Sequence, residues 1–129
     1  MKDIENREDI VLMVNSFYEK VNKDELISHF FSTVIDVNWE KHLPVMYNFW
    51  ENIIFGSPVY EGNPMKPHIA LNQKSPMEAR HFERWLELFL GTVDELFSGD
   101  RAEFTKQRAI SIATVMQIKL IEKNKSSNQ

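Results

Sequence analysis

Apolar residues recur at steps of three and four along most of this chain, and that spacing limits its fold more than any other feature. In the first stretch, over about residues 8–21, the pattern includes Met13, Phe17 and Val21. Such a step places apolar side chains on one face of an α-helix, whereas a half-buried strand would alternate. No segment of the sequence alternates in that way, and no internal repeat or linker interrupts it. With 129 residues, the sequence predicts one all-α domain, 1–129.

Capping residues predict where the next helices begin and end. Asp24 is a predicted N-cap for a short helical stretch, 26–31, whose apolar residues are in phase. A third element follows Asp36. Because Pro44 lies within it, this helix either starts near the proline or is kinked there. Gly56 is expected to end it.

Two further helices carry start signals. The run Ser75-Pro76-Met77-Glu78 combines a capping serine, a first-turn proline and a glutamate that reaches back to close a capping box. The run Asp100-Arg101-Ala102-Glu103 repeats this capping logic for the last helix. The tail, about 122–129, is polar and expected to fray.

Charge and composition exclude several classes of function. The net charge is −4 and the basic residues are scattered, so the chain lacks the basic surface that nucleic-acid binding requires. No apolar run approaches the roughly 18 residues that span a bilayer, and the N-terminus lacks the apolar core of a signal peptide. Without cysteine there is no disulfide, thiolate ligand or covalent haem attachment through C-x-x-C-H. A cytoplasmic protein without nucleic-acid or membrane partners is therefore expected.

One long connection, 57–74, holds three prolines and one glycine and is expected to be a structured loop that carries His68. Tyr18, His42 and Trp85 lie on apolar helical faces. Each of these four residues taken alone fits a plainer role, as a surface imidazole or as a core residue with a satisfied polar atom. Together, one imidazole able to bind iron and three hydrogen-bonding side chains match the contents of a haem pocket. The aromatic content of 12% fits a pocket for a flat ligand as well as a Phe-rich core.

Several short blocks recur in this order and spacing in a known family. They are Phe17-Tyr18, Trp39-Glu40-Lys41-His42, Phe49-Trp50, Tyr60-Glu61-Gly62-Asn63-Pro64-Met65 followed by His68, and His81-Phe82 followed by Trp85-Leu86. On these blocks the chain resembles the truncated haemoglobins, and within them group III, over nearly its whole length. The glycine-rich hinge motifs typical of the other two groups are missing, as they are in group III.

The resemblance implies a globin-like fold, a truncated two-over-two helical sandwich around a non-covalent b-type haem. His68 matches the proximal iron ligand of the family. Tyr18, His42 and Trp85 match its distal tyrosine, histidine and tryptophan, which would form a polar ligand pocket. Phe31 matches the phenylalanine that packs on the face of the haem.

Some residues keep more than one interpretation. His42 could gate the pocket mouth, donate to a bound ligand or act as a sixth iron ligand, and we favour a gate or a donor. His81 would either face a haem propionate or be a solvated histidine at a helix start. Met46 and Trp50 are expected to form pocket wall and core. His29 is expected at the surface.

These features predict a haem protein that reversibly binds dioxygen or another diatomic gas, with oxygen transport as one role. A pocket with three polar side chains would also suit redox chemistry, either nitric oxide oxidation by bound oxygen or a peroxidase-like reaction, and a reductase would then be a partner. Whether the protein is an enzyme stays open, and a monomer is expected. The alternative is a cofactor-free helical module that binds a partner protein and purifies colourless.

Overall fold

The computed structural model describes residues 1–30, 38–57 and 77–127, and side chains as far as residue 120. Four helices lie in these ranges: α1 (Arg7–Lys23), α2 (Trp39–Phe55), α4 (Ala79–Leu96) and α5 (Asp100–Ser127). No strand occurs in the described part of the chain. The prediction of an all-α fold is confirmed.

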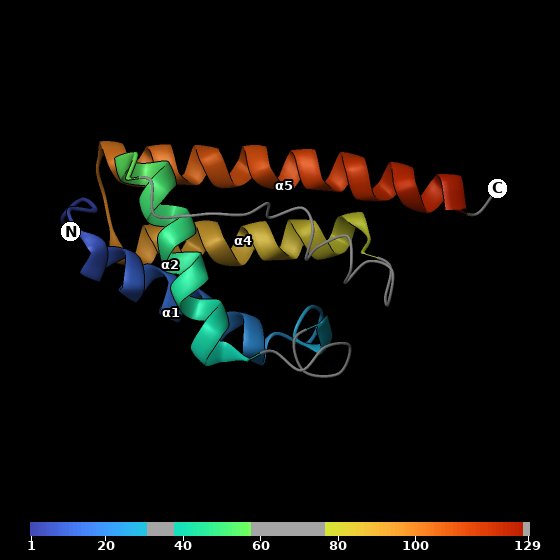
Figure 1. The fold of residues 1–129 in the computed structure, drawn as a ribbon, viewed down its shortest axis with the longest axis horizontal. Helices are drawn as coiled ribbons and strands as arrows, with labels where there is room; N and C mark the ends of the chain where they lie inside the picture. Colours follow the sequence, from blue (N-terminus) through green and yellow to red (C-terminus); the bar gives the residue numbers. More distant parts are fainter. Residues whose placement is uncertain (31–37, 58–76, 128–129) are drawn as a thin grey trace.

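The helices form two packed pairs, α4 with α5 and α1 with α2. Helices α4 and α5 lie side by side along the long axis of the molecule, and α1 packs against α4 (Figure 1). Helix α2 crosses this layer, with contacts to α1 and to α5. This arrangement is the two-over-two sandwich that the resemblance to the truncated haemoglobins implied.

The core lies where these pairs meet. The predicted apolar stripe of α1 is buried there, with Met13, Phe17 and Val21 among its members. The stripe of α2 is less covered. Among its residues only Trp50 is fully buried, while Leu43, Met46, Phe49, Ile53 and Ile54 are half-buried and pack against the core.

Helix α2 passes through Pro44, so the alternative in which it starts near this proline is wrong. The helix begins after Asn38, whose carbonyl accepts the N–H of His42 at 2.9 Å. Gly56 ends the helix as predicted. Its φ of 70° lies in the left-handed region, and its N–H bonds the carbonyl of Asn52 at 2.9 Å.

Asp24 caps the turn that follows α1, as predicted. Its carboxylate accepts the backbone N–H groups of Leu26 and Ile27 at 3.0 and 3.2 Å. Residues 25–28 form turns rather than a regular helix, so the expected helical stretch is wrong over these positions. Its last residue, Phe31, lies outside the described residues.

Helix α4 starts later than the sequence predicts. Glu78 is the N-cap residue instead of the third helical residue, and Ser75 and Pro76 lie outside the described residues. His81 takes the third position, where its Nδ1 accepts the N–H of Glu78 at 2.9 Å. The expected capping box is therefore shifted by three residues, with an imidazole in the role expected for the glutamate.

Helix α5 receives its cap from the other end of the chain. The carboxylate of Asp3 accepts the N–H groups of Arg101 and Ala102, both at 2.9 Å. The prediction that the run from Asp100 to Glu103 supplies its own cap is therefore wrong. Gly99, with φ of 143°, lets Asp3 approach, because a Cβ at that position would lie 2.5 Å from the Asp3 Cγ.

Candidate functional site

Two of the predicted distal residues are in direct contact. Tyr18 projects from α1 and His42 from the first turns of α2, and the Tyr18 Oη lies 3.1 Å from the His42 Nε2. That separation is a hydrogen bond, and both side chains are half-buried. The crossing of α1 and α2 thus brings together two polar groups that lie 24 residues apart in the chain.

The ring of Trp39 packs against both Tyr18 and His42. Trp39, the first residue of α2, meets the rings of Tyr18 and His42 edge-on, with centroids 5.2 and 5.5 Å apart. The rings of Tyr18 and His42 are themselves 5.3 Å apart and steeply inclined. Edge-to-face contacts of this kind are favourable, so Tyr18, Trp39 and His42 form what we call the three-ring cluster.

Burial sets the protonation state of the phenol. Desolvation in this environment raises the pKa of Tyr18 well above its ordinary value of 10.0. The hydroxyl therefore keeps its proton at any physiological pH. A neutral phenol has one proton to donate and can also accept a hydrogen bond.

Trp85 lies on α4 and reaches the three-ring cluster through another aromatic residue. Phe17 meets Tyr18 edge-on at 5.0 Å and Trp85 at 5.7 Å. Trp85 is half-buried and stacks on Phe89 with centroids 5.7 Å apart. On the side of α4 the site therefore consists of aromatic rings, and Phe17 lies between Tyr18 and Trp85.

Two residues predicted to line a cofactor lie on α2. Trp50 is 5% exposed and stacks on Phe89 at 4.8 Å, so it lies deep in the core. Met46, one turn after His42, is half-buried and packs against the core. Both positions agree with the expected wall and core roles, and whether either contacts a cofactor stays a prediction.

His81 is not the solvated histidine of one interpretation, because it is only 5% exposed. Its ring meets Phe30 edge-on at 5.0 Å, and the ring of His29 lies 5.9 Å away. Burial lowers the pKa of His81, the charges of Arg80 and His29 lower it further, and Glu78 opposes them. The imidazole is therefore held neutral, with Nδ1 accepting the Glu78 N–H.

The position of His29 was also predicted incorrectly. The sequence places it at the surface, yet it is half-buried and its ring lies 4.0 Å from that of Phe30. No sequence signal indicated the His29–Phe30–His81 group, because Glu78, the capping residue three positions before His81, was expected inside the helix.

The predicted iron ligand, His68, lies outside the described residues, as does Phe31. Within the described ranges no group of three or more His, Cys, Asp or Glu residues could hold a metal ion. Likewise, no described helix is both long enough and apolar enough to cross a membrane.

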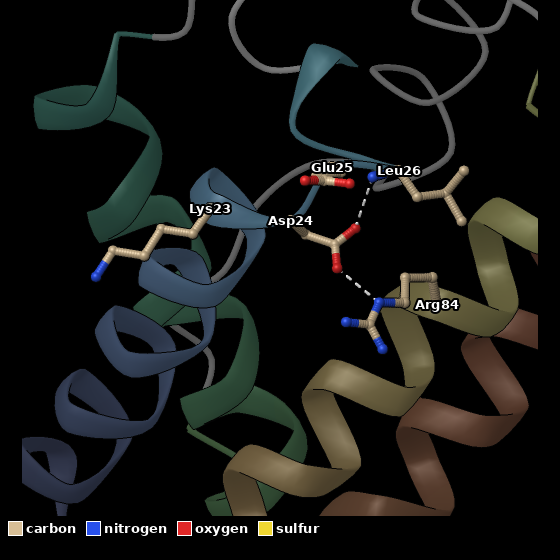
Figure 2. Close-up of a pocket in the computed structure, with 5 residues that line it drawn as sticks. All are labelled: Lys23, Asp24, Glu25, Leu26 and Arg84. Carbon is tan, nitrogen blue, oxygen red and sulfur yellow. Dashed lines mark hydrogen bonds and ion pairs between the residues drawn. The ribbon is translucent and has the colours of Figure 1, made fainter.

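A surface hollow at the end of α1 is separate from the predicted site. It is lined by Lys23, Asp24, Glu25, Leu26 and Arg84, none of which was predicted as a site residue. Figure 2 shows the Arg84 side chain reaching from α4 to the Asp24 carboxylate, at 2.6 Å. Burial alone would raise the pKa of Asp24, but Arg84 and two backbone N–H groups outweigh it and lower the pKa. This ion pair ties α1 to α4, and no sequence signal indicated Arg84.

The helical fold is that of a globin. The family model of bacterial-like globins matches residues 2–119, and the chain belongs to that family. A solved structure, the group III truncated hemoglobin from Campylobacter jejuni, superposes with a TM-score of 0.79 at 32% identity, covering 93% of this chain and 95% of the other.

Sequence relatives make the assignment narrower. The group 3 truncated hemoglobin ctb of Campylobacter jejuni is 33% identical over 115 residues, which is 87% of this chain and 88% of that protein. The group 1 truncated hemoglobin GlbN of Synechocystis is 31% identical over 86 residues, 66% of this chain and 67% of that protein. Within the bacterial-like globins, the chain is a group III truncated haemoglobin. Membership of this family implies haem binding and, through the haem, binding of a diatomic ligand, which argues against the cofactor-free alternative.

Proposed function

We propose that this protein holds haem b non-covalently through the imidazole of His68 and binds dioxygen, or another diatomic gas, beside Tyr18, His42 and Trp85. The observation that carries the proposal is the hydrogen bond of 3.1 Å between the Tyr18 Oη and the His42 Nε2. It forms a polar pair on otherwise apolar helical faces, inside a fold whose family binds haem.

The described residues fit such a group. Leu43, Met46 and Phe49 of α2 are half-buried apolar side chains of the kind that cover a flat macrocycle. The chain has no cysteine, so a covalent attachment through thioethers is excluded and a b-type haem is the form that fits. When bound, haem supplies an iron centre whose ligand affinity depends on the polarity and access of the distal side.

Tyr18 is the proposed main donor in this pocket. Its hydroxyl stays protonated and buried, so it can donate to a small ligand that carries partial negative charge. A net hydrogen bond is worth about 1 kcal/mol, which corresponds to a fivefold to tenfold slower release of the ligand. Trp85 can donate only through its indole N–H, which suits the same role.

His42 and His81 have supporting roles in this proposal. His42 lies at the start of α2 and contacts Tyr18, which fits a gate or a donor. The Nδ1 of His81 is occupied by the Glu78 N–H, so only its Nε2 is left to meet a haem propionate.

The same polar pocket suits redox chemistry as well as storage or transport. We propose nitric oxide or peroxide as the co-substrate in that case, with a reductase as partner. Mixing the oxygenated protein with nitric oxide in a stopped-flow instrument, followed by a test for a reductase that regenerates the ferrous form, separates these roles, because only an enzyme sustains repeated turnover. A monomeric cytoplasmic protein also stays part of the proposal, and sedimentation and cell fractionation test it.

Absorbance spectroscopy tests the central proposal. Protein expressed with a supply of haem should show a Soret band, and His68→Ala should lose the band or change its coordination signature. His29→Gln, on an imidazole that the proposal leaves outside the pocket, is the matched control and should keep the native spectrum. A colourless native protein would disprove haem binding. An unchanged spectrum in His68→Ala would instead disprove iron ligation by His68.

A further inference from the structure

The hydrogen bond that His81 makes at the start of α4 fixes the protonation state of its ring. Its Nδ1 accepts the backbone N–H of Glu78 at 2.9 Å. A backbone N–H can only donate, so this Nδ1 is bare and the single proton of the neutral ring lies on Nε2. Neither nitrogen is then free to bind a metal ion. A second proton can be added only at Nδ1, and adding it breaks the bond to Glu78.

The same ring joins α4 to the segment that follows α1. It meets the ring of Phe30 edge-on at 5.0 Å, and the ring of His29 lies 5.9 Å away. His81 is 5% exposed and Phe30 is 1% exposed. A neutral imidazole packs well in such a place, whereas a charged imidazole loses most of its hydration there. A positive charge on His81 therefore opposes both the bond to Glu78 and the burial of the ring beside Phe30.

The neighbouring charges give a charged ring little compensation. Burial disfavours a positive charge on His81, the charges of Arg80 and His29 disfavour it further, and Glu78 favours it. The Glu78 carboxylate already pairs with Arg80 at 3.0 Å. Within the described part of the chain, these are the charged groups that act on the ring. A haem propionate at Nε2, which belongs to the proposed function, would favour the charged ring without restoring the bond at Nδ1.

We propose that His81 is an acid-sensitive latch, which holds the start of α4 against Phe30 while its ring is neutral and releases both when Nδ1 takes a proton. The closed latch binds fewer protons than the open one, because the pKa of the buried ring lies below its ordinary value of 6.5. Acid therefore favours the open latch from pH 6.5 down to the pKa of the closed state, by up to about tenfold for each pH unit.

The opening is confined to the first turn of α4, because the next contacts do not depend on His81. The Arg84 side chain holds the Asp24 carboxylate at 2.6 Å, which ties α4 to the end of α1. Burial acts to raise the pKa of Asp24, but Arg84 and two backbone N–H groups outweigh it and keep the pKa below 3.8. This ion pair therefore persists in mild acid. Phe82 packs on the other side, with Met116 and Leu120 of α5.

Amide hydrogen exchange, followed by nuclear magnetic resonance, measures the latch at the bond that it makes. The full chain is labelled with ¹⁵N, reduced and saturated with carbon monoxide, so that any haem is diamagnetic. The protection of the Glu78 amide, corrected for the intrinsic effect of pH on exchange, should fall between about twofold and thirtyfold from about pH 8 to about pH 5. The Phe97 amide is the internal control, since it bonds the Val93 carbonyl at the far end of α4 and should keep its protection.

Two variants separate the titration of His81 from its packing. In His81→Gln the side chain still accepts the Glu78 N–H but takes no proton, so protection should be near the native value at about pH 8 and constant to about pH 5. In His81→Leu the acceptor is lost, and protection should be low at both pH values. The nuclear Overhauser effect between the His81 and Phe30 rings gives a second readout in the native protein, and it should weaken in acid.

Four outcomes would overturn the inference. A protonated Nδ1 at about pH 8, seen in the ¹⁵N shift of the ring, would mean that His81 does not accept the Glu78 N–H. A change in Glu78 protection of less than about twofold would mean that a proton does not open the latch. An equal fall in His81→Gln would assign the effect to another group, and an unchanged ring contact in acid would leave Phe30 unreleased. None of these measurements needs haem, so failure of the proposed function would leave the test intact.

Discussion

Replacing Asp3 tests the most unexpected contact of the fold, the cap that the N-terminal segment supplies to α5. The Asp3 carboxylate accepts three backbone N–H groups, from Ile4 at 2.8 Å and from Arg101 and Ala102 at 2.9 Å. Losing an N-cap side chain costs about 1 kcal/mol, and a carboxylate at a helix N-terminus adds about 0.3–1 kcal/mol. We therefore expect Asp3→Ala to lower the free energy of unfolding by about 1–2 kcal/mol.

The matched control is Asp100→Ala, which removes the residue that the sequence alone predicts as the cap. Asp100 is exposed and lies in the first turn of α5, so its loss should cost only about 0.3–0.5 kcal/mol through the helix dipole. Urea unfolding of both variants, followed by circular dichroism at equal haem loading, gives the two values. If Asp100→Ala costs as much as Asp3→Ala, the cap from Asp3 is refuted.

The same contact predicts a pH dependence. Burial would raise the pKa of Asp3, but hydrogen bonds from Arg101, Ile4 and Ala102 and the charge of Arg101 outweigh it and lower the pKa below 3.8. A carboxyl group with a lowered pKa stabilises the fold above its unfolded value and loses that contribution as the pH falls through the folded value. The stability difference between the native protein and Asp3→Asn should therefore be constant at neutral pH and shrink below about 3.8. A difference that persists unchanged in acid would contradict this account.

Three further predictions concern the site and its supports. Tyr18→Phe should speed oxygen release about fivefold to tenfold in stopped-flow measurements, and an unchanged rate would remove Tyr18 from the ligand's surroundings. His81→Leu should cost about 1 kcal/mol in urea unfolding while His81→Gln retains most of the stability, because glutamine also closes a capping box. The pKa of His81 is lowered, so its contribution should be lost as the pH falls below 6.5, and a flat profile would contradict it. Arg84→Met should lower the free energy of unfolding because it leaves the buried Asp24 carboxylate without its ion pair, whereas Arg80→Met, on an exposed pair, should leave it nearly unchanged.

Local patterns determined the helices of this protein. The three-and-four spacing in α1 and α2 predicts the faces that the fold buries, because the period of a helix is fixed by its own backbone hydrogen bonds. Gly56 and Asp24 act where the sequence placed them, since a left-handed C-terminal residue and a capping carboxylate need only neighbouring atoms. The family blocks then predicted which side chains belong to the site.

Tertiary structure alone decided which of these side chains meet. The chain order gives no reason for Asp3 to cap a helix 98 residues away, or for Arg84 to pair with Asp24 across 60 residues. The burial of His81 likewise depends on its packing against Phe30, a residue of another segment. Hydrogen bonds within a turn follow from local geometry, whereas these contacts exist only once separate helices have packed.

The contact between Tyr18 and His42 illustrates the same division. The sequence by itself identified Tyr18 and His42 as polar residues on apolar stripes, because periodicity assigns each to a face of its own helix. Their approach to 3.1 Å was decided by the crossing of α1 and α2, with Trp39 packed against both rings. A helical period fixes the direction of a side chain about one axis, and only the packing of two axes sets the distance between their side chains.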